Sequence, residues 1–227
     1  MKTAILIPAR YGSTRFEGKP LCTLDGVPMI KRVYDACIAS KIPTYVLTDS
    51  MQIASLFNWD TCWIDQEVEF QNGTERCAGA INGELLNKYD RFINVQGDMP
   101  DVTTDMIEAC VKLLDTYSVS TVYTPMPEEM QNDPNSVKMV RAGDQALWFG
   151  RGMTGYGDWH LGIYGYTRNA LESYMSLPQE REEKIEQLEQ LRWLKSGCKI
   201  GCSSVYFNGI EINSPQDVIE WHNKHSL

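Results

Sequence analysis

The sequence predicts an α/β protein whose core is an open, mostly parallel β-sheet flanked by helices. Short apolar runs that are typical of buried strands alternate with segments in which apolar residues recur at helical spacing. The first run, Ala4–Ile7, lies at the N-terminus and leads into a loop of small and basic residues. A chain of 227 residues can bury a sizeable core. We expect one domain over residues 1–227, with a β-rich insertion at about 125–166.

The first half of the chain carries most of the strand–helix alternation. Apolar runs predict strands at 4–7, 44–47, 62–64, 92–95 and 119–123. Helical patterns predict helices at 28–40, 74–86 and 103–114. Met29, Val33 and Cys37 share the inner face of the first helix. Asp49 or Ser50 can cap a helix that follows the strand at 44–47. Thr103 or Thr104 can cap the helix at 103–114.

After Pro125 the alternation of strand and helix patterns stops, because prolines and glycines divide the chain into short pieces. Strand-like pieces at 137–140, 146–149 and 161–166 predict the β-rich insertion.

The C-terminal part returns to helix. Residues 182–196 form a helical pattern that is acidic at its start and basic near its end, with Gly197 as a C-cap. Ile185, Leu188 and Leu191 would face the core. A strand at 199–205 and a helix from Ser214 complete the chain.

Composition restricts the classes of function. With 21 basic and 30 acidic residues the net charge is −9, which argues against nucleic acid or an anionic membrane as partner. No run approaches the roughly 20 apolar residues that a membrane span needs. The 7 cysteines are odd in number and contain no Cys-x-x-Cys pair, so reduced thiols in a cytoplasmic protein are favoured over disulfides or zinc.

The loop after the first strand is the strongest chemical signal. Its cations Arg10, Arg15 and Lys19 are interleaved with small residues such as Ser13 and Gly18. Backbone N–H groups can approach a polyphosphate closely in such a loop, and the cations offset its charge. Taken alone, the loop is also compatible with a solvated basic turn.

A second signal follows the strand at 92–95. In the sequence Val95-Gln96-Gly97-Asp98-Met99-Pro100 the acid stands where a strand ends, and ligands of open α/β sheets bind at that edge. Asp98 could hold a divalent cation that bridges phosphates, or it could cap the next helix.

The loop resembles the first motif of the 3-deoxy-manno-octulosonate (Kdo) cytidylyltransferases. It has their order of Pro-Ala-Arg-Tyr, a small residue, Ser-Thr-Arg, two residues and Gly-Lys-Pro-Leu. It is neither a Walker A loop nor a Gly-x-Gly-x-x-Gly loop. Asn72–Arg76, Val95–Pro100, His160–Tyr166 and Leu188–Arg192 are similar to further motifs of the family. The resemblance implies a Rossmann-like, GT-A-like nucleotidyltransferase fold.

The resemblance also implies residue roles. The catalytic residues would be Arg10, Arg15, Lys19 and Asp98, with Asp98 and Asn213 on magnesium. The residues that contact CTP or the sugar acid would be Ala9, Ser13, Gly73, Thr74, Arg76, Gln96, Arg151, His160, Tyr164, Glu189 and Gln190. Arg151 would meet the sugar carboxylate, and His160, Glu189 and Gln190 would read hydroxyls.

The chain departs from the family pattern at three positions. Met99 replaces a Glu, and only Arg151 survives from the family's Ser-Arg-Ala-x-Ile-Pro segment, with a shortened connection from there to His160. Asn213 replaces an Asp that helps to hold magnesium, and an amide oxygen can still bind a hard cation without the charge. Glu211, two residues earlier, would share a strand face with Asn213 and could compensate.

We therefore expect an enzyme that couples CTP to a 3-deoxy sugar acid and releases pyrophosphate, with Mg²⁺ as cofactor. The resemblance implies a homodimer, joined partly through the β-rich insertion, and a product for lipopolysaccharide or other cell-surface polysaccharide. Two alternatives remain open at this point. One is a nucleotidyltransferase for another sugar or alditol phosphate, and the other is a non-catalytic nucleotide-binding relative.

Overall fold

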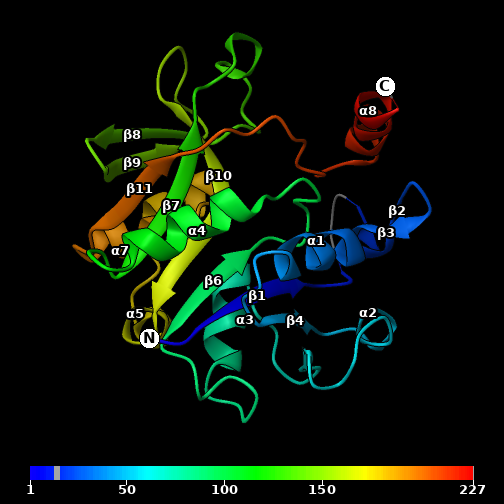
Figure 1. Ribbon diagram of the computed structural model, residues 1–227. Coiled ribbons are helices and arrows are strands. Elements are labelled where there is room, and N and C mark those ends of the chain that lie inside the picture. The colour runs from blue at the N-terminus through cyan, green and yellow to red at the C-terminus, as the bar shows by residue number, and fades with distance from the viewer. Residues whose placement is uncertain (13–15, 227) are drawn as a thin grey trace.

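A nine-stranded β-sheet forms the centre of the molecule (Figure 1). The computed structural model describes residues 1–12 and 16–226, so the predicted site residues Ser13 and Arg15 lie outside the described part. The strands are β1 (Thr3–Ala9), β4 (Thr44–Thr48), β5 (Cys62–Ile64), β6 (Arg91–Val95), β7 (Val119–Thr124), β8 (Lys138–Ala142), β9 (Gln145–Gly150), β10 (Asp158–Thr167) and β11 (Ile200–Ser204). Their order is β5-β4-β1-β6-β10-β7-β11-β9-β8, and β2 (Thr23–Leu24) and β3 (Val27–Pro28) form a separate hairpin.

The sheet is mixed, which corrects the expectation of a mostly parallel one. Strands β5, β4, β1 and β6 are parallel, as predicted. The long strand β10 then runs antiparallel to both β6 and β7, so the run at 161–166 belongs to the middle of the main sheet and not to an insertion. An apolar run predicts a buried strand but carries no information on its direction. The hairpin β8–β9 extends this sheet and pairs with the start of β10.

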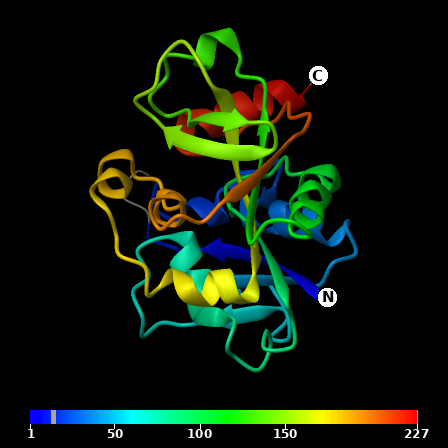
Figure 2. The ribbon, with the colours of Figure 1, turned by 90° about the vertical axis from the view of Figure 1, so that its left-hand side faces the viewer.

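Helices cover both faces of the sheet because alternate residues of each strand point to opposite sides. On one face Ile5 and Ile7 of β1 pack with α1 (Met29–Ile38), α2 (Met51–Ala54) and α4 (Thr104–Leu113). On the other face Ala4 and Leu6 pack with α3 (Gly73–Ala80), α5 (Arg168–Tyr174) and α7 (Leu191–Lys195). In Figure 2 the teal α3 and the yellow α5 lie together over this second face.

The helix predicted at 182–196 is two shorter helices. The chain forms α6 (Arg181–Glu186), turns at Gln187 with φ 56°, and resumes as α7. As a result Leu188 and Leu191 are buried, but Ile185 is 65% exposed and not part of the core. A non-glycine residue in the left-handed region is uncommon, so periodicity alone could not place this break.

Capping residues confirm two predicted helix starts and correct one. The side chain of Thr103 accepts a hydrogen bond from the N–H of Met106 at the start of α4, and Ser50 caps α2. Helix α3 begins at Gly73 and not at Thr74, because Asn72 is its N-cap and accepts from the N–H of Glu75 at 2.8 Å.

The C-terminal helix α8 (Pro215–His225) lies away from the main sheet, beside α1 and the β2–β3 hairpin (Figure 1). Trp221 packs there with Leu24, Met29 and Ile212. Its indole Nε1 donates to Asp101 at 3.0 Å, and the other oxygen of Asp101 accepts from the N–H of Ile210 at 3.0 Å. One carboxylate thus holds both the helix and the segment that leads to it.

All of the cysteines are free thiols, and most of them are buried. Within residues 1–12 and 16–226, no helix has the length and apolar character that a membrane crossing requires.

We expect Gly165→Ala to destabilise the fold by about 1–3 kcal/mol, since overpacking a strand centre displaces its neighbours. A Cβ at Gly165 would lie 2.3 Å from Ser120 Oγ and 3.2 Å from Ile93 Cδ1. Urea denaturation measures the loss. Gly152→Ala is the matched control, because the nearest atom to its Cβ is 4.0 Å away, and equal losses in both variants would contradict the packing argument.

Candidate active site

A cavity of about 650 Å³ opens where β1 and β6 end and β10 begins. This is the edge at which ligands of α/β sheets bind. Every described residue predicted for the site lines it except Thr74: Ala9, Arg10, Lys19, Gly73, Arg76, Gln96, Asp98, Arg151, His160, Tyr164, Glu189, Gln190 and Asn213. Thr74 lies directly beneath the cavity wall, where its hydroxyl contacts the Tyr166 hydroxyl at 3.0 Å.

One end of the cavity is cationic. Lys19 begins a short 3-10 helix after Gly18, whose positive φ and hydrogen bond to the carbonyl of Tyr11 close the loop. The Lys19 ammonium contacts Asp98 at 2.6 Å. Arg10, by contrast, is exposed at the mouth of the cavity. This pair of cations is suited to the charge of a polyphosphate.

The N-terminus of α3 forms the neighbouring wall. Gly73 packs so closely there that a Cβ would lie 3.1 Å from both Pro8 and the Gln96 side chain. Arg76 is 4% exposed and is held by Asp49 at 2.9 Å. Its Nη1 is buried and has no hydrogen-bond partner within the described part of the chain, so a ligand in the cavity could satisfy it.

His160 is a neutral hydrogen-bonding group. It is buried against Phe149, and burial together with the charge of Arg151 lowers its pKa to about 3. The hydroxyl of Thr121 donates its one hydrogen to the carbonyl of Ile163 at 2.7 Å and lies 2.9 Å from His160 Nε2. With the hydroxyl proton on that carbonyl, the matching tautomer has the ring proton on Nε2 and leaves Nδ1 as an acceptor.

Glu189 and Gln190 form the opposite wall, on the turn between α6 and α7. Burial raises the pKa of Glu189 to about 7, although its carboxylate accepts the N–H of Thr74 at 3.2 Å. Gln190 is 1% exposed, and neither its Oε1 nor its Nε2 has a partner among the residues that the structure describes. Two amide atoms that are buried without partners are costly, so this side chain is suited to a polar ligand.

Arg151 links the two segments that border this wall. Its Nε and Nη1 donate to the carbonyls of Glu186 and Asn135 at 3.2 and 2.7 Å. Its backbone N–H donates to the Glu186 carboxylate at 2.7 Å. Because the two guanidinium partners are neutral carbonyls, these bonds leave the charge of Arg151 available to an anionic ligand.

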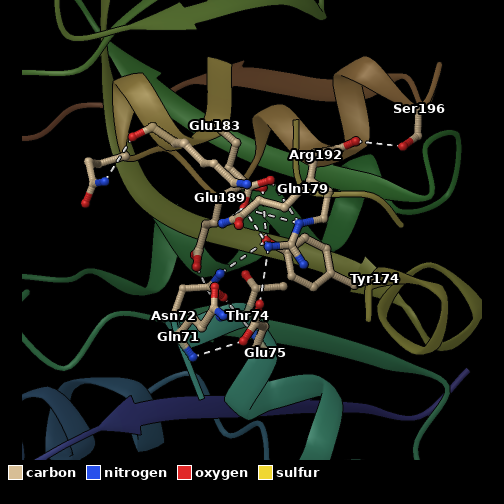
Figure 3. A network of polar contacts seen from close by, with 12 residues as sticks. Gln71, Asn72, Thr74, Glu75, Tyr174, Gln179, Glu183, Glu189, Arg192 and Ser196 are labelled. Atoms are coloured by element: carbon tan, nitrogen blue, oxygen red, sulfur yellow. Dashed lines mark hydrogen bonds and ion pairs between the residues drawn. The ribbon is translucent and has the colours of Figure 1, made fainter. Parts of the chain in front are cut away.

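A buried ion network beneath the cavity joins its two sides (Figure 3). Arg192 contacts Glu183 at 2.6 Å and Glu75 at 3.2 Å, and these side chains are all less than one-tenth exposed. Glu75 also accepts the N–H of Gln71 at 2.9 Å. Arg192 ends the Leu188–Arg192 motif, and the motif gives no sign of this network. Its partner Glu75 lies 117 residues away, so no local pattern could reveal the pair.

The possible metal ligands lie on two adjacent segments. Asp98 and Asn213 both line the cavity, and the N–H of Ile212 donates to the carbonyl of Asp98 at 3.0 Å. Glu211 lines the cavity too, although residues 205–213 form no strand and the expected strand face does not exist. The described residues contain no group of three His, Cys, Asp or Glu side chains with metal-site geometry. A hard cation here would need oxygen ligands from the substrate as well.

Comparison with known proteins decides the family. The family model of the cytidylyltransferases matches residues 4–200.

The chain belongs to the cytidylyltransferase family. It is 37% identical over 235 residues to the 8-amino-3,8-dideoxy-manno-octulosonate cytidylyltransferases of Shewanella sp. strain ANA-3 and Shewanella oneidensis, with 96% of each chain covered. A solved structure of CMP:2-keto-3-deoxy-manno-octonic acid synthetase complexed with CTP is 28% identical, has a TM-score of 0.89 and covers 100% of this chain and 99% of that one.

More distant structures share the fold of this cytidylyltransferase. The 4-diphosphocytidyl-2C-methyl-D-erythritol synthase of Anaerococcus prevotii has a TM-score of 0.69 at 9% identity, over 100% of this chain and 99% of that one. At that identity the similarity concerns the α/β architecture alone.

We expect Arg192→Met to lower the free energy of unfolding by about 3–5 kcal/mol, because it leaves two buried carboxylates without their cation. Lys195→Met on the same helix removes an exposed ion pair with Glu182 at 3.1 Å and should cost at most about 1 kcal/mol. Urea denaturation compares the two variants. Similar losses would mean that the buried network contributes no more than a surface pair.

We expect Glu189→Gln to raise the melting temperature at pH 8 but not at pH 4.5. Folding raises the pKa of this carboxyl from 4.5 to about 7, so the folded protein retains a proton that the unfolded chain releases. The contribution of Glu189 to the free energy of unfolding therefore falls as pH rises from about 4.5 to about 7. The neutral amide removes this loss, and we expect a gain of roughly 2–5 °C.

Glu182→Gln is the control for this pH dependence. Hydrogen bonds from its own backbone N–H and from Lys195 lower the pKa of Glu182, so its replacement should give no gain at pH 8. Melting curves of both variants from pH 4.5 to pH 8 test the sign. An equal gain in melting temperature at pH 4.5 and pH 8 would show that the gain does not come from removing the charge of Glu189.

Proposed function

We propose that this cytidylyltransferase couples CTP to Kdo or its 8-amino analogue, with release of pyrophosphate. The proposal rests on one cavity with two different ends. Arg10 and Lys19 form a cationic end, and His160 and Glu189 form an end that can hydrogen-bond hydroxyls. The named relatives act on such an octulosonate, and the structural neighbour was solved with CTP.

The nucleotide would bind at the cationic end. Arg10 and Lys19 would hold the triphosphate, and Gly73 would let the nucleotide approach the N-terminus of α3 closely because it has no side chain there. The buried Nη1 of Arg76 would donate to the nucleotide from the same side. Lys19 would then exchange Asp98 for phosphate, because both compete for one ammonium group.

The sugar acid would bind between Arg151 and the Glu189–Gln190 turn. Arg151 would pair with its carboxylate, and Gln190 would satisfy both amide atoms on its hydroxyls. His160 Nδ1 would accept a hydrogen bond from a further hydroxyl. This arrangement favours a sugar acid over a sugar phosphate, because Glu186 and Glu189 would repel a doubly charged phosphate more strongly than a single carboxylate.

In the reaction the anomeric hydroxyl forms a bond to the α-phosphorus of CTP, the bond to pyrophosphate breaks, and the hydroxyl proton is released. Phosphoryl transfer of this kind depends on alignment and on stabilisation of charge. Arg10 and Lys19 would stabilise the charge that develops on the departing pyrophosphate. Magnesium, held by Asp98 and Asn213 when bound, would lower the pKa of the attacking hydroxyl.

We also propose that the enzyme is a cytoplasmic homodimer that supplies lipopolysaccharide synthesis. The free thiols support a reducing compartment. The homodimer rests on the family resemblance alone. Sedimentation measures it directly, and a monomer at micromolar concentration would refute it.

The decisive experiment is pyrophosphate release from the purified protein with CTP and magnesium. The acceptors are Kdo, 8-amino-Kdo, sialic acid and none. Release that depends on one octulosonate supports the proposal and identifies the acceptor. Release only with sialic acid, or CTP binding without release for any acceptor, would refute it.

We expect Lys19→Ala to lower kcat at least roughly 100-fold, since it removes a cation from the departing charge. The fold should persist because Lys19 lies on the cavity wall and outside the core. Lys31→Ala, which removes an exposed i,i+4 pair on α1, is the matched control and should leave kcat unchanged. Unchanged turnover in a folded Lys19→Ala variant would remove this loop from the mechanism.

A further inference from the structure

Glu211 is an acid that neither the fold nor the nucleotide contacts described above account for. Its side chain lines the cavity, but its Oε1 is shielded from solvent and has no donor within residues 1–12 and 16–226. A buried carboxylate oxygen without a donor is unfavourable unless a cation meets it. The backbone N–H of Gly162 bonds this carboxylate, and Arg151 and Lys19 are near enough to attract it, but Oε1 itself has no hydrogen-bond partner there, so a cation in the cavity would stabilise it further.

The backbone holds Glu211 beside Asp98. The N–H of Ile212, the next residue, donates to the Asp98 carbonyl, and the N–H of Ile210 donates to Asp101. Asn213 is fixed by its N–H to Asp217 at 2.7 Å. Three oxygen-bearing side chains, those of Asp98, Glu211 and Asn213, thus line one cavity from two segments that are tied together.

Neither nearby cation forms an ion pair with Glu211 within the part of the chain that the structure describes. Lys19 contacts Asp98, and Arg151 is bonded to carbonyls of Asn135 and Glu186. Asp98 and Glu211 place two carboxylates of like charge on one cavity, and the bond from the N–H of Ile212 to the Asp98 carbonyl ties their segments together. A pair of carboxylates with an amide oxygen is a donor set for a hard divalent cation.

We propose that Glu211 supplies to the divalent cation the carboxylate charge that Asn213 lacks, so that Asp98, Glu211 and the amide oxygen of Asn213 hold it together. The inference rests on the proposed function in one respect, because the proposed function identifies the cation as the one that accompanies CTP.

The test is Mn²⁺ binding to the full-length protein, followed by electron paramagnetic resonance and by competition with Mg²⁺, without CTP and with it. We expect Glu211→Gln, which preserves shape, to weaken Mn²⁺ binding in the presence of CTP about tenfold or more. Asn213→Asp in that background should restore most of the affinity. Glu186→Gln is the matched control, since its carboxylate lines the same cavity but bonds the N–H of Arg151, and it should leave Mn²⁺ affinity unchanged.

Unchanged Mn²⁺ affinity in a Glu211→Gln variant that melts like the parent would overturn the inference. The same holds if Glu211→Gln leaves Mn²⁺ affinity intact and raises only the KM for 8-amino-Kdo, because Glu211 would then bind the acceptor ammonium. An equal loss in Glu186→Gln would also overturn it, since the effect would then be general to the charge of the cavity. The readout does not require turnover, so a loss of Mn²⁺ affinity without pyrophosphate release would refute the proposed function and leave this inference standing.

Discussion

The contact of Arg192 with Glu183 and Glu75 is the constraint on which the site depends. It joins α3, whose N-terminus borders the end of the cavity proposed for the nucleotide, to the α6–α7 turn, which borders the end proposed for the acceptor. Both ends of the cavity are thereby fixed to one guanidinium group. Replacing either acid would alter the distance between the two substrates, and phosphoryl transfer is sensitive to that distance.

Local sequence was sufficient wherever a motif and its structure occupy the same few residues. The parallel strands from 4–7 to 92–95 and the caps at Ser50 and Thr103 are of this kind. The motifs also located most of the cavity lining, because the ends of β1 and β6 meet at one edge of the sheet. The chemical roles of those lining residues remain predictions.

Three features could not be predicted because they depend on residues that are distant in sequence or on backbone conformation. The direction of β10 is set by pairing with β6 and β7, and its apolar pattern is the same in either direction. The left-handed Gln187 divides a helical pattern that has no glycine or proline at the break. Glu75 becomes a partner of Arg192 only when α3 and α7 pack against one face of the sheet.

The anchoring of α8 by Asp101 has a practical consequence for the chain's end. Because α8 packs on the β2–β3 hairpin and not on the main sheet, its release would leave the central core intact while freeing the segment that carries Glu211 and Asn213. Such local opening needs less free energy than global unfolding. A change that releases α8 would therefore disturb the cavity while leaving the central sheet folded.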